Sequence, residues 1–174
     1  ITRRINILRT HNGFFNNTKS LLDIGCGNGG SLFKIYPHFK SCHGIDIIDE
    51  SITTLRNSIE SKNINNCTAF THDIDKIIVN DSYYDRAISF EVLEHVKDEK
   101  STLSNIYKSL KNEALFAISV PNKWWLFETH GAQLPLLPWN RVPFFSWLPN
   151  RIHSQYAKAR IYTKGQICNL LEAA

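Results

Sequence analysis

The chain has 174 residues, of which 43% are hydrophobic and 21% are charged, and its formal net charge is +4. These values are typical of one globular domain, and the modest positive charge does not require a nucleic-acid partner. No apolar stretch approaches the ~20 residues of a membrane span and no secretory signal is visible, so we expect a cytoplasmic protein. The four cysteines form no C-x-x-C pair, which argues against a zinc knuckle, and we expect no bound metal.

Residues 1–19 are mostly polar and predict an N-terminal arm that contains a short helix. Between residues 20 and 120, short apolar runs alternate with amphipathic stretches. The runs predict five strands, at residues 20–25, 41–47, 67–73, 83–90 and 114–120. The stretches between them predict helices, at residues 31–39, 49–63 and 98–112. Such alternation predicts an α/β domain with a doubly wound parallel sheet, in which the continuously apolar last strand would be central.

Residues 121–160 break this alternation, because they hold five of the six prolines and all four tryptophans. The segment is too apolar for a disordered linker, and its prolines exclude a long helix. A long insertion after a strand end is often functional, so we expect an irregular lid or substrate-binding insertion. Residues 161–174 then predict a helix that begins with a capping box of Thr163 and Gln166.

The stretch Leu21–Gly30, LLDIGCGNGG, follows the first predicted strand and can be interpreted in two ways. Gly25, Gly27 and Gly30 match the G-x-G-x-x-G pattern of a dinucleotide site, where a pyrophosphate lies on a helix N-terminus. Asp23 favours the second interpretation, because a carboxylate beside a pyrophosphate is unfavourable. S-adenosylmethionine carries an ammonium and a sulfonium but no phosphate, and it therefore suits Asp23 better than a nicotinamide cofactor does.

Acidic residues also follow the next two strands. Asp46 stands about 20 residues after the glycines, where a carboxylate can accept hydrogen bonds from both hydroxyls of a ribose. Asp73 could accept from the exocyclic amine of adenine, with Ile47 and Ile74 on the faces of the ring. Because ligands of parallel sheets bind beyond the carboxyl ends of the strands, we expect these residues at one edge.

The chain resembles class I S-adenosylmethionine-dependent methyltransferases in five successive motifs over residues 20–122. The motifs are LLDIGCGNGG, GIDIIDESI, THDID, YDRAISFEVLEHVKD and LFAISVPN. Within that class it is similar to small-molecule enzymes of the ubiquinone-biosynthesis O-methyltransferase type. The resemblance implies a Rossmann-like sheet in the order 3-2-1-4-5, and we expect its usual C-terminal hairpin to be missing. Glu113 and Ala114 stand where the family usually has a glycine turn.

The same resemblance assigns the cofactor site to the loop and the strand ends. The residues expected to contact S-adenosylmethionine, or its product S-adenosylhomocysteine, are Asp23, Gly25, Cys26, Gly27, Asp46, Ile47, Asp73, Ile74, Phe90 and Glu91. His95 follows the fourth strand and is the candidate catalytic base, because histidine changes its charge near neutral pH. Capping of the helices is the structural alternative for Asp46 and Asp73, and His95 could equally be structural.

The methyl acceptor is less well defined by the sequence. Trp124, Trp125 and His130 are candidate substrate residues, although packing is the simpler role for each. The aromatic insertion favours a small, apolar or lipid-like acceptor, and the resemblance to O-methyltransferases favours O-methylation. Residues 121–160 could alternatively contact a membrane surface. A nucleic-acid methyltransferase and a nicotinamide-dependent oxidoreductase remain alternatives, but neither a base-reading Asn/Asp-Pro-Pro-Tyr loop nor a second dinucleotide-binding half is present.

Overall fold

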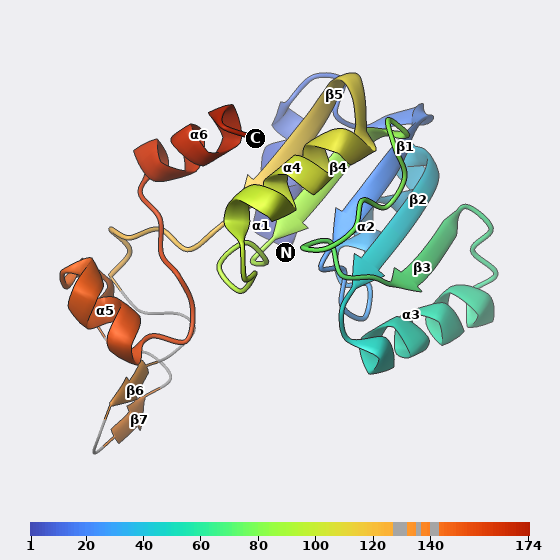
Figure 1. Ribbon diagram of the computed structural model, residues 1–174. Helices are drawn as coiled ribbons and strands as arrows, with labels where there is room; N and C mark the ends of the chain where they lie inside the picture. The colour runs from blue at the N-terminus through green and yellow to red at the C-terminus, as the bar shows by residue number, and fades with distance from the viewer. Residues whose placement is uncertain (127–131, 135–136, 140–142) are drawn as a thin grey trace.

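A computed structural model describes residues 1–126, 132–134, 137–139 and 143–174. Its main sheet has five parallel strands in the order β3-β2-β1-β4-β5 (Figure 1). The strands are β1 (Asn16–Ile24), β2 (Phe39–Asp46), β3 (Cys67–Thr71), β4 (Tyr84–Phe90) and β5 (Leu110–Ser119). The helices are α1 (Thr2–Thr10), α2 (Leu32–Ile35), α3 (Asp49–Ser61), α4 (Glu99–Ser109), α5 (Asn150–Tyr156) and α6 (Lys164–Glu172). The expected α/β fold and strand order are therefore confirmed.

Helices cover both faces of this sheet, because alternate strand residues point to opposite sides. On one face Leu21 and Ile88 pack in a core with the apolar residues of α1, α2 and α3. On the other face Leu22 and Ile24 pack with Leu103 of α4 and with residues of α6. The register pairs Ile24 with Ile45 of β2 and with Ser89 of β4, so the carboxyl ends of three strands meet at one edge.

The position of β5 agrees with this strand order but not with the central place that its apolar run predicts, because the strand pairs only with β4 in the described sheet and lies at its edge. Its apolar residues are half-buried under helices rather than central, which a continuous apolar run alone does not distinguish. Glu113 stands where the family usually has a glycine turn, and it adopts a φ angle of +61°. A non-glycine residue thus takes the left-handed conformation that a glycine would favour there.

Residues 121–160 contain more regular structure than the prolines suggest. A two-stranded antiparallel sheet joins β6 (Ala132–Leu134) to β7 (Leu137–Trp139), and α5 follows, apart from the main sheet in Figure 1. The ends of the segment are held together, because Tyr162 N donates to Pro121 O (2.9 Å) and Lys123 N donates to Tyr162 O (2.9 Å). The insertion therefore leaves and re-enters the domain at one place. α6 begins with the expected capping box of Thr163 and Gln166.

The loop between α1 and β1 is fastened to β4 by one buried cation. The Arg86 guanidinium donates to the carbonyl oxygens of Gly13 (2.7 Å), Phe14 (3.2 Å) and Asp85 (2.6 Å). Buried carbonyl groups that lose a charged donor are costly to leave unpaired. Arg86 therefore couples the N-terminal helix to the sheet.

We predict that Arg86→Ala lowers the free energy of unfolding by about 2–4 kcal/mol, because it leaves buried carbonyls without a donor. The matched control is Arg56→Ala, which removes an exposed arginine with one bond to a carbonyl, from Nε to Ala69 O (2.8 Å). That variant should lose no more than about 1 kcal/mol. Urea unfolding measures both values, and equal losses would contradict the role of Arg86.

Candidate active site

The glycine loop after β1 turns sharply beneath the end of β2. Gly25, Gly27 and Gly29 have φ angles of +68°, +52° and +91°, in the region that glycine adopts without strain. The backbone N–H groups of Gly25 (2.8 Å) and Cys26 (3.0 Å) both donate to Ile45 O. The alternating glycines are therefore a requirement of the turn itself.

The glycines differ in what surrounds them. A Cβ atom on Gly25 would lie 2.2 Å from Cγ2 of Val92, so this side of the loop is closed by the segment after β4. A Cβ atom on Gly27 would meet nothing within 4 Å. The open side of the loop at Gly27 is therefore where a ligand can approach the backbone.

Asp23 is a buried acid directly before this loop. Only 2% of the residue is exposed, and its Oδ2 atom has no hydrogen-bond partner among the described residues. Burial, and then the charge of Asp46, raise the pKa of Asp23 to about 8. An unsatisfied buried carboxyl group is costly in the free protein. A cationic ligand that reached Asp23 would remove that cost.

Asp46 at the end of β2 connects the loop to the next turn. Its Oδ2 accepts from Gly27 N (2.9 Å), and its Oδ1 accepts from Ile48 N (3.0 Å). A carboxylate oxygen has a second lone-pair direction, so both oxygens retain capacity for a ligand. Ile47, beside it, is 69% exposed at the strand end and offers an apolar surface.

The residues after β3 lie next along the edge. Asp73 is half-buried, and a hydrogen bond from Lys76 is the main cause that lowers its pKa. The Nζ of Lys76 lies 2.8 Å from Oδ2 of Asp73. Ile74 is buried in the core of the α4 face, so in this state its side chain does not face the loop opening.

At the end of β4 a strained residue joins three elements. Glu91 has φ +61°, and strained backbone of this kind is often found at functional sites. Its Oε1 accepts from Ser119 Oγ of β5 (2.8 Å) and pairs with Arg4 of α1 (2.7 Å). The Arg4 guanidinium also lies 5.7 Å from the centre of the Phe90 ring. These contacts bring α1 to the edge that carries the glycine loop.

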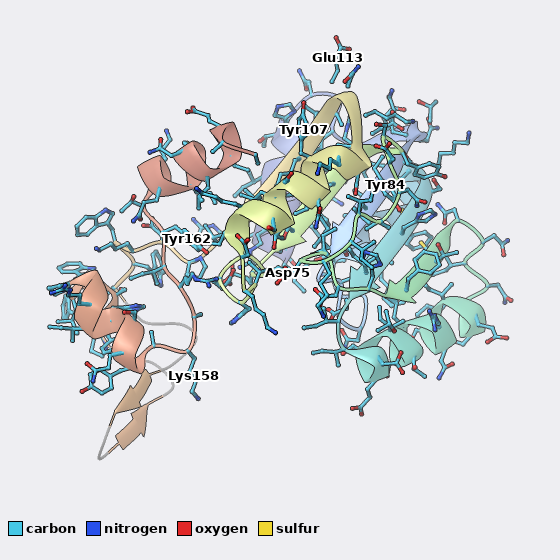
Figure 2. All side chains as sticks on the ribbon, in the orientation of Figure 1. Asp75, Tyr84, Tyr107, Glu113, Lys158 and Tyr162 are labelled. Atoms are coloured by element: carbon cyan, nitrogen blue, oxygen red, sulfur yellow. The ribbon has the colours of Figure 1, made fainter. Side chains whose placement is uncertain are left out.

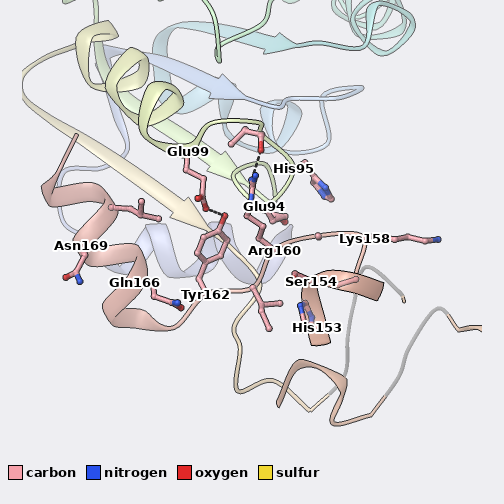
Figure 3. A pocket seen from close by; sticks show the side chains of 15 residues that line it. Glu94, His95, Glu99, His153, Ser154, Lys158, Arg160, Tyr162, Gln166 and Asn169 are labelled. Atoms are coloured by element: carbon pink, nitrogen blue, oxygen red, sulfur yellow. Dashed lines mark hydrogen bonds between the residues drawn. The ribbon is translucent and has the colours of Figure 1, made fainter. Parts of the chain in front are cut away.

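A cavity of about 700 Å³ opens beside the end of β4 (Figure 3). One wall comes from the segment between β4 and α4, and the other from α5, α6 and the chain between them. Its charged and polar lining residues are Glu94, His95, Glu99, His153, Ser154, Lys158, Arg160, Tyr162, Gln166 and Asn169. None of the glycine-loop residues lines the cavity.

Two side chains hold the walls of this cavity together, and Figure 3 shows both. The Tyr162 hydroxyl donates to Glu99 Oε1 (2.5 Å) and lies 3.1 Å from Leu93 O. Arg160 donates from Nη1 to Val96 O (2.5 Å). The cavity therefore depends on contacts between segments more than 60 residues apart in sequence.

The structure adds Glu94 to the residues that the sequence singled out. Glu94 lines the cavity with only 3% of the residue exposed, and burial raises its pKa to about 7. His95 lines the same cavity and is exposed. The sequence signal that could have indicated Glu94 is its place in the FEVLEHV motif, but its burial depends on the fold.

Two of the three predicted substrate residues of the insertion do not line the cavity. Trp124 and Trp125 are exposed and are not among its lining residues. His130 lies outside the described residues. In the described part of the chain, no group of three or more His, Cys, Asp and Glu side chains could hold a metal, and no helix is long and apolar enough to cross a membrane.

Cys26, one of the residues expected to contact the cofactor, is buried, and desolvation raises the pKa of its thiol. His153 of α5 is also buried, and the centre of its ring lies 5.1 Å from that of Phe145. The structure thus brings together Asp23, the glycines and Asp46, while His95 lies in the adjoining cavity.

Two curated proteins illustrate the relationship of this chain to known sequences. It is 29% identical over 105 residues to N-methyltransferase 4 of Papaver somniferum, which is 59% of this chain and 30% of that protein. It is 31% identical over 116 residues to the ubiquinone biosynthesis O-methyltransferase of Glaesserella parasuis, which is 64% of this chain and 48% of that protein. The chain thus spans less than half the length of these relatives.

A solved structure extends the likeness to the fold. The S-adenosylmethionine-dependent methyltransferase of Mesorhizobium loti matches with a TM-score of 0.70 at 18% identity, over 96% of this chain and 78% of that one. A family model described as a methyltransferase domain matches residues 15–168, which include the whole main sheet, the glycine loop and most of the cavity-lining residues. The chain therefore belongs to the methyltransferase domain family.

Proposed function

We propose that the protein binds S-adenosylmethionine at the glycine loop and transfers its methyl group to an acceptor in the adjoining cavity. The acceptor is a small molecule, and we favour a hydroxyl group on an apolar or lipid-like compound. When bound, the cofactor supplies an electrophilic methyl group on a sulfonium. The residues of this chain supply binding, orientation and, for a hydroxyl acceptor, removal of a proton.

The observation that carries this proposal is the buried Asp23 carboxyl group with its unpaired oxygen. A dinucleotide would bring a pyrophosphate to the same loop, where a second negative charge is unfavourable. A ligand ammonium would instead pair with Asp23 in a region shielded from water. The membership in the methyltransferase family and the name of the Mesorhizobium protein support the same cofactor.

The cavity supports an acceptor with both polar and apolar parts. Lys158 and Arg160 bring positive charge to its walls, and Leu170 and Ile161 bring apolar surface. A volume of about 700 Å³ lies within the range of small-molecule sites. The names of the relatives include both N- and O-methyltransferases, so the preference for a hydroxyl rests on the candidate bases in the cavity.

Two side chains are proposed as the proton acceptor. His95 is the residue that the sequence indicates, and its place in the cavity is compatible with that role. Glu94 is the alternative that the structure adds. A carboxylate with a pKa of about 7 is half-ionised at neutral pH and is better matched to proton removal than an ordinary glutamate. Its place beside the end of β4 suits a role close to the transferred methyl group.

The cofactor assignment predicts a large effect of Asp46 on binding. We expect Asp46→Ala to weaken S-adenosylhomocysteine binding about ten- to a hundred-fold, because charge-assisted hydrogen bonds contribute about 1.5–3 kcal/mol. Isothermal titration calorimetry measures the affinity, and NAD serves as the ligand that should not bind.

The control tests whether the loss of any carboxylate near the loop weakens binding to the same extent. Asp49→Ala removes a nearby exposed carboxylate, which accepts from Thr71 Oγ1 rather than from the glycine loop. This variant should bind S-adenosylhomocysteine within about threefold of the wild type, since exposed polar groups contribute little. Binding of NAD without binding of S-adenosylhomocysteine would contradict the proposed function.

The raised pKa of Glu94 predicts that the free energy of unfolding depends on pH, and this prediction can be tested without a methyl acceptor. Because its folded-state pKa of about 7 exceeds the ordinary value of 4.5, the unfolded chain ionises first as pH rises. Stability associated with Glu94 is thus present below pH 4.5 and is lost progressively up to about pH 7. In Glu94→Gln, the free energy of unfolding should fall by about 3 kcal/mol less than in the wild type over this pH range.

Urea unfolding at several pH values checks this prediction, with the exposed Glu60→Gln of α3 as the matched control. The control should follow the wild-type profile. A Glu94→Gln profile that runs parallel to the wild type throughout would remove Glu94 from consideration as a base and leave His95 as the candidate.

A further inference from the structure

Among the residues of 121–160 whose burial the structure describes, the exposed large apolar side chains lie in three stretches of chain. Trp124 is 63% exposed, and the others are close to half exposed. We call this set the aromatic patch, and its members are Trp124, Trp125, Leu126, Phe144, Trp147 and Ile152. An apolar cluster of this size on a surface marks an interaction site.

Specific contacts hold two of the three stretches of the aromatic patch together, residues 124–126 and 144–147. Phe144 N donates to Leu126 O (2.7 Å), and the Ser146 hydroxyl donates to Trp125 O (2.6 Å). The rings of Phe144 and Trp147 meet edge to face with their centres 5.0 Å apart. The patch is therefore an ordered surface and not a set of isolated side chains.

The charge of the segment indicates what the aromatic patch contacts. Residues 121–160 contain five basic residues and one acidic residue, so their formal charge of +4 equals that of the entire chain. Two of the basic residues adjoin the patch, since Lys123 lies 6.0 Å from the Trp124 ring and Arg151 precedes Ile152. Tryptophan together with lysine and arginine is the composition that favours the interface of an anionic bilayer.

The position of α5 relates this surface to the cavity. His153 and Ser154 of α5 line the cavity, whereas Arg151 and Ile152 on the same helix are exposed. Lys158, just after α5, also lines the cavity and projects away from the main sheet in Figure 2. The aromatic patch and the cavity are thus two sides of one insertion.

We propose that the aromatic patch docks the protein peripherally on an anionic membrane surface. Docking brings the cavity to the headgroup region, where an acceptor carried by a lipid could enter. The docking itself is independent of methyl transfer, and only the lipid-borne acceptor rests on the proposed function. A second copy of the chain or another protein on the patch would be a different outcome, which the experiment distinguishes.

Co-sedimentation tests the proposal with vesicles of phosphatidylcholine alone and of phosphatidylcholine mixed with phosphatidylglycerol. The wild-type chain should bind the anionic vesicles, bind neutral vesicles weakly, and lose binding as salt rises. The double variant Trp124→Ser, Trp147→Ser should bind at least about tenfold less, because interfacial affinity scales with buried apolar area. The double reversal Lys123→Glu, Arg151→Glu should weaken binding to anionic vesicles alone.

The matched control is Tyr107→Ser with Ile77→Ser, which removes two equally exposed apolar side chains outside the insertion. Tyr107 is 68% exposed on α4 and lies far from Lys158 in Figure 2. This variant should bind vesicles within about twofold of the wild type. Thermal unfolding shows that each variant is folded.

Three results would overturn the proposal. One is no binding of the wild type to either vesicle, and another is equal binding by the tryptophan variant and the wild type. The third is a dimer in sedimentation velocity that the tryptophan variant converts to a monomer without any vesicle binding. Calorimetry with S-adenosylhomocysteine tests the proposed function separately, so a failure of docking is distinguishable from a failure of the cofactor assignment.

Discussion

The carboxyl group of Asp23 is held out of water directly before the glycine loop, and the rest of the site is arranged around it. β1 pairs with β2 on one side and with β4 on the other, so Asp23 lies near the carboxyl end of a central strand. The positive φ angles at Gly25, Gly27 and Gly29 turn the chain over this position while Asp46 binds the loop from β2. The fold thereby holds a buried carboxyl group, with one oxygen that has no partner in the described part of the chain, near the place where a ligand can reach the backbone of Gly27.

The second half of the site depends on different interactions. Tyr162 and Arg160 return from the insertion to the segment after β4, and their bonds to Glu99 and Val96 close the cavity. The cavity then adjoins the strand ends where Glu91 joins α1 and β5. Under the proposed function, the cofactor binds at the edge of the sheet and the acceptor binds between the sheet and the insertion. This arrangement suits methyl transfer, because catalysis of that reaction rests mainly on positioning.

The alternation of strands and helices could be predicted, because apolar runs and glycines mark the strands and their ends. The strand order, in contrast, followed from the resemblance to class I methyltransferases. The loop and the strand-end acids follow from the rule that ligands bind at the carboxyl edge of parallel strands. The edge position of β5 could not be inferred from its apolar run, since helices that half-bury a strand produce the same pattern. The left-handed conformation of Glu113 likewise carries no signal in its residue type.

The cavity also could not be predicted from the sequence pattern. Its two walls meet through single side chains, such as Tyr162 on Leu93 O, that have no periodicity and span more than 60 residues. The burial that raises the pKa of Glu94 likewise depends on contacts between segments that are distant in sequence. Residues 121–160 were recognised as unusual from their tryptophans and prolines, but their small sheet and helix depend on contacts within the insertion.

Proton release on ligand binding tests the central role of Asp23 most directly. With a pKa of about 8 the free carboxyl group is mostly protonated at pH 7, and pairing with a ligand ammonium should ionise it. Calorimetry of S-adenosylhomocysteine binding in buffers of different ionisation enthalpy should therefore give release of about one proton in the wild type and none in Asp23→Asn. Tight binding to the wild type without any proton release would contradict the account.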